Sequence, residues 1–155
     1  MKKIATHNSA TGEKGGGLLS WLVTPFSRCQ SKTLIEQYDA GCRYFDLRVR
    51  FFDDGRFYFA HGLWKSKVSA IDLIVEFCEH IKQGDKVYLM VTYEGCDPSW
   101  KAQNFADVAE FYGEDKVIVT TVNESCQRQA RASSTATNLI APLLCIINYS
   151  LIVIC

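Results

Sequence analysis

Two histidines, one arginine and two carboxylates fall where predicted strands of this chain end. His7 follows the first strand, and Asp46 and Arg48 lie near the end of the second. His61 follows a predicted hairpin, and Glu94 follows a later strand. A pair of histidines can serve as general base and general acid, and a guanidinium neutralises charge on phosphoryl oxygens. These residue types therefore suit transfer at phosphorus.

Strands and helices alternate through the first 121 residues. Apolar, β-prone runs predict strands at 2–5, 42–49, 87–93 and 117–121, and the Asp-Gly step in 53–56 between aromatic runs predicts a hairpin. Helical spacing and capping signals predict helices from Thr33 to a Gly41 cap, over 69–83 with Gly84 as its cap, and over 97–112. The short apolar stretch Leu18–Val23 is expected to stop at Pro25.

This alternation predicts an α/β fold with a parallel sheet, namely a partial (β/α)8 TIM barrel of about four strand–helix units. The chain is shorter than the ~250 residues of a closed barrel. The carboxyl ends of barrel strands form one face, so the five polar residues are expected to meet there. We expect a half barrel over 1–122, a polar linker over 123–138 and an apolar tail over 139–155 that is buried, membrane-seeking or a non-native end.

Each of these residues also has a simpler explanation. A single histidine after a strand is usually a surface or turn residue, and Asp46 and Arg48, two apart on one strand, could be a structural ion pair. His80 lies within a predicted helix and is interpreted as a solvated face residue. The glycine-rich stretch at 15–17 lacks the lysine pattern of a phosphate-binding loop and is interpreted as a flexible loop.

Composition narrows the class of partner and compartment. The 155 residues carry 17 basic and 17 acidic side chains, so there is no basic surface of the kind that selects nucleic acid. The seven cysteines form no CxxC pair and mostly lie in apolar runs, which favours core thiols in a reducing compartment. No apolar stretch follows Met1-Lys2-Lys3, so we predict no signal peptide and a cytoplasmic or membrane-associated protein.

Three motifs occur in a fixed order: Thr6-His7-Asn8-Ser9, then a strand reading GCRYFDLRV over 41–49, then His61-Gly62. In this order and spacing, with Gln30-Ser31 opening a helix between the first two, they resemble the N-terminal half of the X domain of phosphatidylinositol-specific phospholipases C, in the bacterial-type branch of the PLC-like phosphodiesterases. The similarity covers residues 3–121. It implies a phosphoric diester hydrolase of lipid metabolism that cleaves phosphatidylinositol or a related inositol phosphodiester.

The resemblance also implies a role for each site residue. His7 would be the general base that takes the proton of the inositol 2-hydroxyl, and His61 the general acid that protonates the diacylglycerol oxygen. Arg48 would stabilise the phosphoryl oxygens, and Asp46 would orient a histidine or the arginine. Asn8 and Glu94 would bind substrate.

No cofactor is expected. Calcium-dependent animal members of the family have an acidic ligand at the position of Arg48, so the resemblance implies metal-independence. Calcium stays the alternative, because Asn8 matches the animal type and Glu94 sits near another position that binds calcium in animal enzymes. The expected partners are a phosphoinositide lipid, transient contact with a membrane surface through Leu18–Val23 with Trp21 and Phe26, and self-association that covers open sheet edges. The alternative interpretation of Trp21 is that its side chain packs in the core.

Two other functions remain open at this point. The chain could be a truncated, weakly active or inactive fragment that binds phosphoinositide headgroups or membrane, because the second half of the barrel is missing and the composition changes after Asn123. It could also act on glycerophosphodiesters, although that group needs a metal-binding carboxylate set that Arg48 disfavours.

Overall fold

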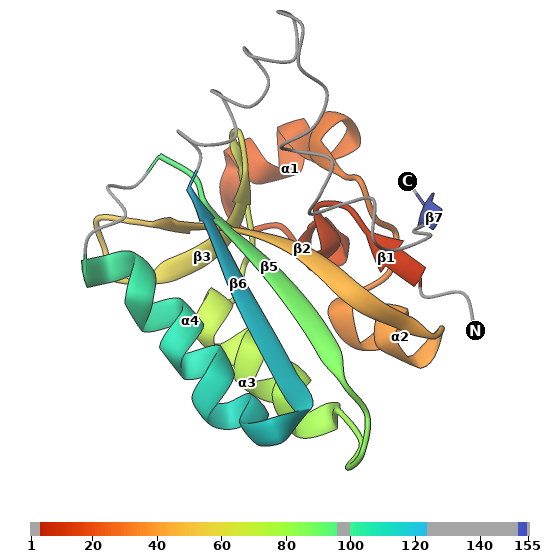
Figure 1. Cartoon of the computed structure of the whole chain (residues 1–155). Coiled ribbons are helices and arrows are strands. Elements are labelled where there is room, and N and C mark those ends of the chain that lie inside the picture. The colour runs from red at the N-terminus through yellow and green to blue at the C-terminus, as the bar shows by residue number, and fades with distance from the viewer. Residues whose placement is uncertain (1–3, 96–99, 124–151, 155) are drawn as a thin grey trace, which may run out of the picture.

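The computed structural model describes residues 4–95, 100–123 and 152–154. Four parallel strands form the centre of its sheet, in the order β1 (Ile4–Thr6), β2 (Cys42–Phe51), β5 (Val87–Tyr93) and β6 (Val117–Asn123). The short strand β7 (Ile152–Ile154) pairs in parallel with β1, at the side of the sheet away from β6 (Figure 1). The predicted α/β fold with a partial barrel of parallel strands is confirmed.

Helices connect the parallel strands and cover one face of the sheet. Between β1 and β2 lie the 3-10 turn η1 (Ser9–Gly12), α1 (Gly17–Ser27) and α2 (Leu34–Asp39). The crossovers to β5 and β6 contain α3 (Ala70–His80) and α4 (Trp100–Gly113), the latter followed by the 3-10 turn η2 (Glu114–Lys116). Figure 1 shows α3 and α4 side by side; α4 packs against β6, and α3 packs against α4 and β3.

The core lies between this helical layer and the sheet. Alternate residues of β2 and β5, among them Phe45, Leu47 and Leu89, are almost fully buried and pack with Ile74 and Phe77 of α3. Because side chains alternate along a strand, the intervening residues of β2 point to the opposite face. Asp46 and Arg48 lie on that opposite face. Burial of Phe45 and Leu47 in the core therefore directs these two polar side chains away from the helices.

The second face of the sheet is only partly covered in the described residues. Tyr44 and Tyr88 stack on it with ring centroids 4.6 Å apart and an interplanar angle of 5°. Met90 is 39% exposed and Ile118 is 43% exposed. In a closed barrel this face would be the filled interior, so its exposure reflects the partial barrel.

The predicted hairpin is present. β3 (Phe57–His61) runs antiparallel to the end of β2, with Phe51 opposite Phe57, and then pairs with β4 (Trp64–Lys65). The turn closes through hydrogen bonds from the amides of Gly55 and Phe52. Gly55 has φ +79°, a conformation that favours glycine. This hairpin extends the sheet beyond the parallel strands and brings His61 back toward the end of β1.

Helix ends follow the sequence signals in part. Thr33 and Glu36 form the predicted capping box of α2, and Ser69 caps α3 by accepting from the amide of Asp72 at 3.1 Å. The predicted stop at Pro25 was wrong, because α1 continues to Ser27. Pro25 has no N–H to donate within the helix, so α1 continues past it with at least one main-chain hydrogen bond missing.

Two other boundaries differ from expectation. α3 ends at His80, three residues before the predicted end, and its terminal cap is Ile81, not Gly84. Ile81 is 3% exposed, so the chain leaves helical geometry where that side chain enters the core. The glycine-rich loop expected to be flexible lies against β4: the Gly16 amide donates to the Lys65 carbonyl at 2.9 Å, and a Cβ at Gly16 would lie 2.9 Å from the Ser66 carbonyl oxygen.

A polar cluster of Tyr38, Arg43 and Asp85 lies near the N-terminal ends of β2 and β5 and gives a prediction about stability in acid. The Tyr38 hydroxyl donates to Asp85, and Arg43 Nη2 lies 2.9 Å from the same carboxylate. The Tyr38 hydrogen bond, with the Arg43 charge, lowers the pKa of Asp85. A carboxyl with a lowered pKa stabilises the fold above its unfolded pKa, and that contribution disappears as the pH falls through its folded value.

Asp85→Asn should therefore lower the urea midpoint at pH 7, and its difference from the parent should shrink as the pH is lowered. Circular dichroism during urea unfolding at several pH values measures this. Glu110→Gln, an exposed carboxyl on α4, is the matched control. A constant difference between Asp85→Asn and the parent at all pH values would contradict the prediction.

Candidate active site

His7 and Asp46 form a direct pair at the end of the parallel strands. The β1–β2 register places Thr6 beside Phe45, so the next residue of each strand comes close to its counterpart. His7 Nδ1 lies 2.6 Å from Asp46 Oδ2, and the Asn8 amide donates to the same oxygen at 3.3 Å. Asp46 is 7% exposed, whereas the His7 side chain is 42% exposed. Nδ1 of His7 therefore donates its proton to the Asp46 carboxylate, and the unprotonated Nε2 is the nitrogen that a substrate can reach.

Small polar residues between these strands fix the position of the carboxylate. The Asp46 amide donates to Ser9 Oγ at 3.0 Å, and Ser9 Oγ donates to the Thr6 carbonyl at 3.0 Å. Asn8 has φ +47° and ψ +48°, the left-handed conformation that asparagine tolerates. The tight turn after β1 explains why this short segment can present the His7 side chain and the Asn8 amide to the same site.

His61 faces His7 across Asn8. The Asn8 Nδ2 atom lies 3.1 Å from His7 Nε2 and 3.4 Å from His61 Nε2. His61 Nδ1 lies 2.9 Å from the carbonyl oxygen of Ser27 at the end of α1. A carbonyl can only accept, so His61 carries its proton on Nδ1 and directs Nε2 to the site. The Nε2 atoms of both histidines thus converge on one amide group.

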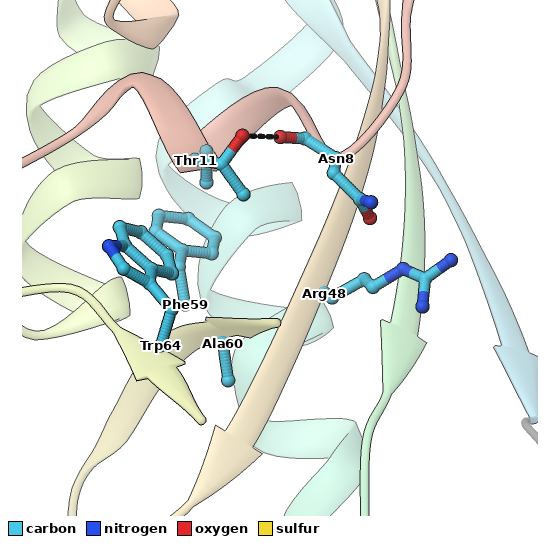
Figure 2. A pocket seen from close by; sticks show the side chains of 7 residues that line it. Asn8, Thr11, Arg48, Phe59, Ala60 and Trp64 are labelled. Atoms are coloured by element: carbon cyan, nitrogen blue, oxygen red, sulfur yellow. Dashed lines mark hydrogen bonds between the residues drawn. The ribbon is translucent and has the colours of Figure 1, made fainter. Parts of the chain in front are cut away.

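Arg48 contributes the positive charge. Its side chain and that of Asn8 line a small depression together with Ala10, Thr11, Phe59, Ala60 and Trp64 (Figure 2). Arg48 Nε and Asn8 Oδ1 are buried and lack a hydrogen-bond partner among the described residues. Buried polar atoms are nearly always paired in native proteins. Within the described residues, a donor and an acceptor without partners therefore line the same depression.

The alternative ion pair between Asp46 and Arg48 is not formed. Although both side chains lie on the same face of β2, the carboxylate of Asp46 is directed to His7. Asp46 thus pairs with His7 instead of Arg48, and the Arg48 guanidinium can bind another anion.

Glu94 lies at the edge of the site and joins two of its elements. It is 9% exposed, its Oε2 accepts from Arg50 Nη2 at 2.7 Å, and its Oε1 accepts from the Gly62 amide at 3.3 Å. Glu94 therefore holds the turn directly after His61. Arg50 was not among the predicted site residues, although its position two residues after Arg48 places it on the same face of β2.

The support from α1 and the following loop was also not foreseen. The Ser27 carbonyl fixes His61, and the Gln30 side-chain amide donates to the His7 carbonyl at 3.0 Å. A backbone carbonyl has no sequence signature, so only the path of the chain could reveal the first of these contacts. Gln30 belongs to the pattern that carried the family resemblance, but its contact with His7 was not predicted.

His80 lies away from this site. Its Nε2 is 3.0 Å from Asp39 Oδ1, and its side chain is 38% exposed. The predicted solvated position agrees with the structure, and the pair with Asp39 offers a second His–Asp contact for comparison with the one in the site.

The described residues offer little to a metal ion. They contain no group of three or more His, Cys, Asp and Glu side chains placed to hold one. Calcium takes six to eight oxygen ligands. Asp46 and Glu94 already accept from His7 and from Arg50, so the oxygens at this site do not fit that requirement.

Within the described residues, no helix is long and apolar enough to cross a membrane.

Cys29 borders the site and gives a prediction about thiol reactivity. Its Sγ lies 3.4 Å from Asn8 Nδ2, and it is partly exposed. Cys42 and Cys78 are also free, but burial raises the pKa of Cys42 and raises that of Cys78 to about 11. The thiolate is the reactive form. Iodoacetamide should therefore alkylate Cys29 before Cys42 and Cys78 in the native chain.

Peptide mass mapping after timed labelling at pH 8 measures the order, and labelling in urea should remove the difference. Cys29→Ser should remove the fast-labelled peptide and so confirms its assignment. The other four cysteines, at 96, 126, 145 and 155, lie outside the described residues, and the prediction does not concern them. Native labelling of Cys42 or Cys78 as fast as Cys29 would be inconsistent with this arrangement.

No protein-family model matches this chain, and no curated protein sequence does. Solved structures do. The phosphatidylinositol-specific phospholipase C of Listeria monocytogenes matches with a TM-score of 0.59 and 16% identity over 81% of this chain and 52% of that one. The enzyme of Staphylococcus aureus matches with a TM-score of 0.59 and 13% identity over 77% of this chain and 46% of that one.

The chain has the fold of about half of a phospholipase C barrel. At these identities the likeness concerns the fold alone, and the chain spans about half the length of the solved structures it matches. The half-barrel prediction is confirmed by these matches. The resemblance to phosphatidylinositol-specific phospholipases C is supported as a similarity of structure.

Proposed function

We propose that this chain is a metal-independent phosphodiesterase of the phospholipase C class, acting on phosphatidylinositol or a related inositol phosphodiester. The observation that carries the proposal is the convergence of His7 Nε2 and His61 Nε2 on the Asn8 amide, at 3.1 and 3.4 Å, beside Arg48. Each histidine has its Nδ1 held by an acceptor, Asp46 for one and the Ser27 carbonyl for the other. Two oriented imidazoles, with a guanidinium whose Nε has no partner among the described residues, are what acid–base transfer at phosphorus needs.

The reaction then proceeds in one displacement. His7 Nε2 removes the proton of the inositol 2-hydroxyl as that oxygen forms a bond to phosphorus. Asp46 stabilises the resulting imidazolium of His7. For this step His61 takes up a second proton, on Nε2, before substrate binds, and gives it to the diacylglycerol oxygen as the bond of that oxygen to phosphorus breaks. The products are a cyclic inositol phosphate and diacylglycerol, and the two histidines have exchanged protonation states.

Arg48 acts on the phosphoryl oxygens throughout. A guanidinium presents several N–H donors in a planar fork, so it can bind two oxygens at once. In this protein the buried Arg48 Nε has no partner among the described residues, so no internal ion pair competes with the phosphate. Asn8 supplies an amide between the two histidines and binds substrate at the same point. Glu94 contributes by holding the turn that carries His61, in addition to its proposed contact with substrate.

A lipid substrate requires contact with a membrane surface, and exposed apolar side chains flank the site. Leu22 and Phe26 on α1 are 53% and 91% exposed, and Leu63, in the turn after His61, is 70% exposed. Apolar and aromatic side chains of this kind favour the membrane interface. We propose that these three residues contact the lipid surface transiently. The side chain of Trp21, also considered for this role, lies outside the described residues.

A second candidate function is a weakly active or inactive fragment that binds phosphoinositide headgroups. It is favoured by the chain's coverage of only about half of each matching phospholipase. A binder needs Arg48 but gains nothing from an oriented base and acid, whereas in this structure both histidines are oriented by acceptors. We therefore prefer the enzyme.

The test uses the purified full chain with two substrates, phosphatidylinositol in detergent micelles and soluble glycerophosphoinositol, each in excess EDTA. Phosphorus NMR follows the products. A cyclic inositol phosphate formed from either substrate is the expected result. Cleavage only after calcium is added would overturn metal-independence. A folded chain that binds phosphatidylinositol vesicles but cleaves neither substrate, with or without calcium, would establish the binding function instead.

A further inference from the structure

One threonine hydroxyl joins the turn after β1 to the short segment 28–31 that follows α1. Thr11 lies in η1, directly after that turn, and is 3% exposed. Its hydroxyl donates to the Asn8 carbonyl at 2.8 Å, the bond drawn in Figure 2. It accepts from the amides of Cys29 and Gln30 at 3.0 and 3.1 Å. A hydroxyl has one proton and two lone pairs, so these three bonds use its full capacity.

The segment after α1 reaches both histidines of the candidate site. The carbonyl of Ser27, the residue before it, lies 2.9 Å from His61 Nδ1 and accepts its proton. Within the segment, the Gln30 side-chain amide donates to the His7 carbonyl at 3.0 Å. The two amides that Thr11 binds lie at and beside this second contact, and within three residues of the first. The position of the segment therefore affects His7 and His61 together.

Side chains at the end of α1 and in the segment after it are exposed to solvent. Phe26 is 91% exposed, and Arg28 is exposed as well. Arg28 donates to two carbonyls of the same segment at 2.9 and 3.0 Å, so these bonds shape the segment without attaching it to the turn after β1. The Gln37 side chain binds the Lys32 carbonyl, which lies beyond the segment. Thr11 attaches the main chain of the segment itself.

We propose that Thr11 is a positioning residue whose hydroxyl sets the distance between His7 and His61. The inference rests on the proposed function, since it concerns the same two histidines. His7 comes from the turn after β1 and His61 from the end of β3, so their spacing depends on contacts between these elements. Nε2 of each lies near the Asn8 amide, at 3.1 and 3.4 Å. The Thr11 hydroxyl acts on the histidines only through the main chain and Gln30, because its bonds are all within the protein.

Loss of the hydroxyl would reach His61 through the Ser27 carbonyl. That carbonyl holds the Nδ1 proton of His61. When the segment moves away, Nδ1 loses its acceptor and the imidazole also populates the tautomer with the proton on Nε2. The same movement shifts the His7 main chain through Gln30. A displacement of about 1 Å at a catalytic group can lower a rate by about 10²-fold, so a small shift has a measurable effect.

Thr11→Val keeps the shape of the side chain and removes the hydroxyl. It should lower kcat for soluble glycerophosphoinositol by about 10–10²-fold with little change in KM, because misplaced histidines affect the chemical step. Thr11→Ser keeps the hydroxyl and should retain most of the parent's kcat. Thr33→Val removes the capping hydroxyl of α2 and is the matched control, which should lose stability but not kcat. An unchanged kcat in Thr11→Val, or an equal loss in Thr11→Ser, would overturn the proposal.

Nitrogen-15 NMR of the histidines tests the inference without turnover, which separates it from the proposed function. At about pH 8.5 the imidazoles are neutral, and His61 of the parent should carry its proton on Nδ1. Thr11→Val should shift His61 toward the other tautomer, and Thr11→Ser should not. His80, paired with Asp39 away from the site, is the internal reference. This shift in a chain that cleaves nothing would refute the proposed function alone. Unchanged His61 signals in Thr11→Val, with an active parent, would refute the role of Thr11.

Gln30→Leu is the second variant and serves if Thr11→Val does not fold. Gln30 is only partly buried, and leucine removes the contact of the segment with the His7 carbonyl. This variant should also lower kcat with little change in KM, because His7 then loses its link to the segment. Full kcat in Gln30→Leu would show that the segment does not position the histidines, and the role of Thr11 would be refuted with it.

Discussion

Replacement of Asp46 by asparagine is expected to lower turnover of the inositol phosphodiester by about 10²–10⁴-fold, with a small change in KM. The carboxylate accepts from His7 Nδ1 at 2.6 Å. An asparagine that donates at this position would favour the other tautomer of His7, in which Nε2 carries the proton and cannot act as a base. It would also remove the charge that stabilises the imidazolium. Both effects fall on the chemical step, so kcat should decrease and not substrate binding.

The molecule contains a matched control for this experiment. His80 and Asp39 also form a His–Asp contact, at 3.0 Å, but lie outside the site. Asp39→Asn should leave turnover unchanged. His7→Ala should be as damaging as Asp46→Asn, and the double variant should be little worse than His7→Ala alone, because both residues act through one imidazole. Full activity in Asp46→Asn, or additive losses in the double variant, would refute this role of Asp46.

Replacement of Arg48 by alanine is the second change with a large expected effect, a loss of about 10²–10³-fold in kcat. In the proposed reaction, Arg48 supplies the charge that offsets the phosphoryl oxygens in the transition state. Its Nε is buried and unpaired within the described chain, so alanine should cost the fold little and the unfolding midpoint should stay near that of the parent. Arg48→Lys keeps the charge but loses the planar fork, and should recover only part of the activity.

Initial rates with soluble glycerophosphoinositol measure this effect, since a soluble substrate removes any contribution from membrane binding. Arg56→Ala, in the exposed hairpin turn, is the control for loss of one surface charge. If Arg48→Ala lost stability as well as activity, Arg48 would be a structural residue. If it lost lipid binding while the parent cleaved nothing, the binding function would be favoured over the enzyme.

Local signals in the sequence predicted much of the fold. The strand at 87–93 has the predicted limits, the Asp-Gly step forms the β2–β3 turn, and Thr33 with Glu36 forms the capping box. These features depend on interactions between residues close in the chain, so short patterns suffice to predict them. The error at Pro25 shows the limit of such patterns: α1 packs against β4 and continues past the proline, which the local rule for proline does not take into account.

The membership of the candidate site was also largely predictable. Parallel strands place their carboxyl ends on one face, which brought His7, Asp46, Arg48 and His61 into consideration together. Period-2 alternation placed Asp46 and Arg48 on the same side of β2. The same alternation would have found Arg50, whose partner Glu94 comes from the end of the neighbouring strand.

Periodicity and short turn and cap signals are therefore enough to predict which elements form and which side chains lie at the candidate site. The pairing of those side chains depends on how the elements pack. Asp46 binds His7 and not Arg48 because the β1–β2 register sets Thr6 beside Phe45. His61 is fixed by the Ser27 carbonyl because α1 continues past Pro25. Such contacts join residues more than 30 positions apart, and their geometry follows from packing that no local pattern encodes.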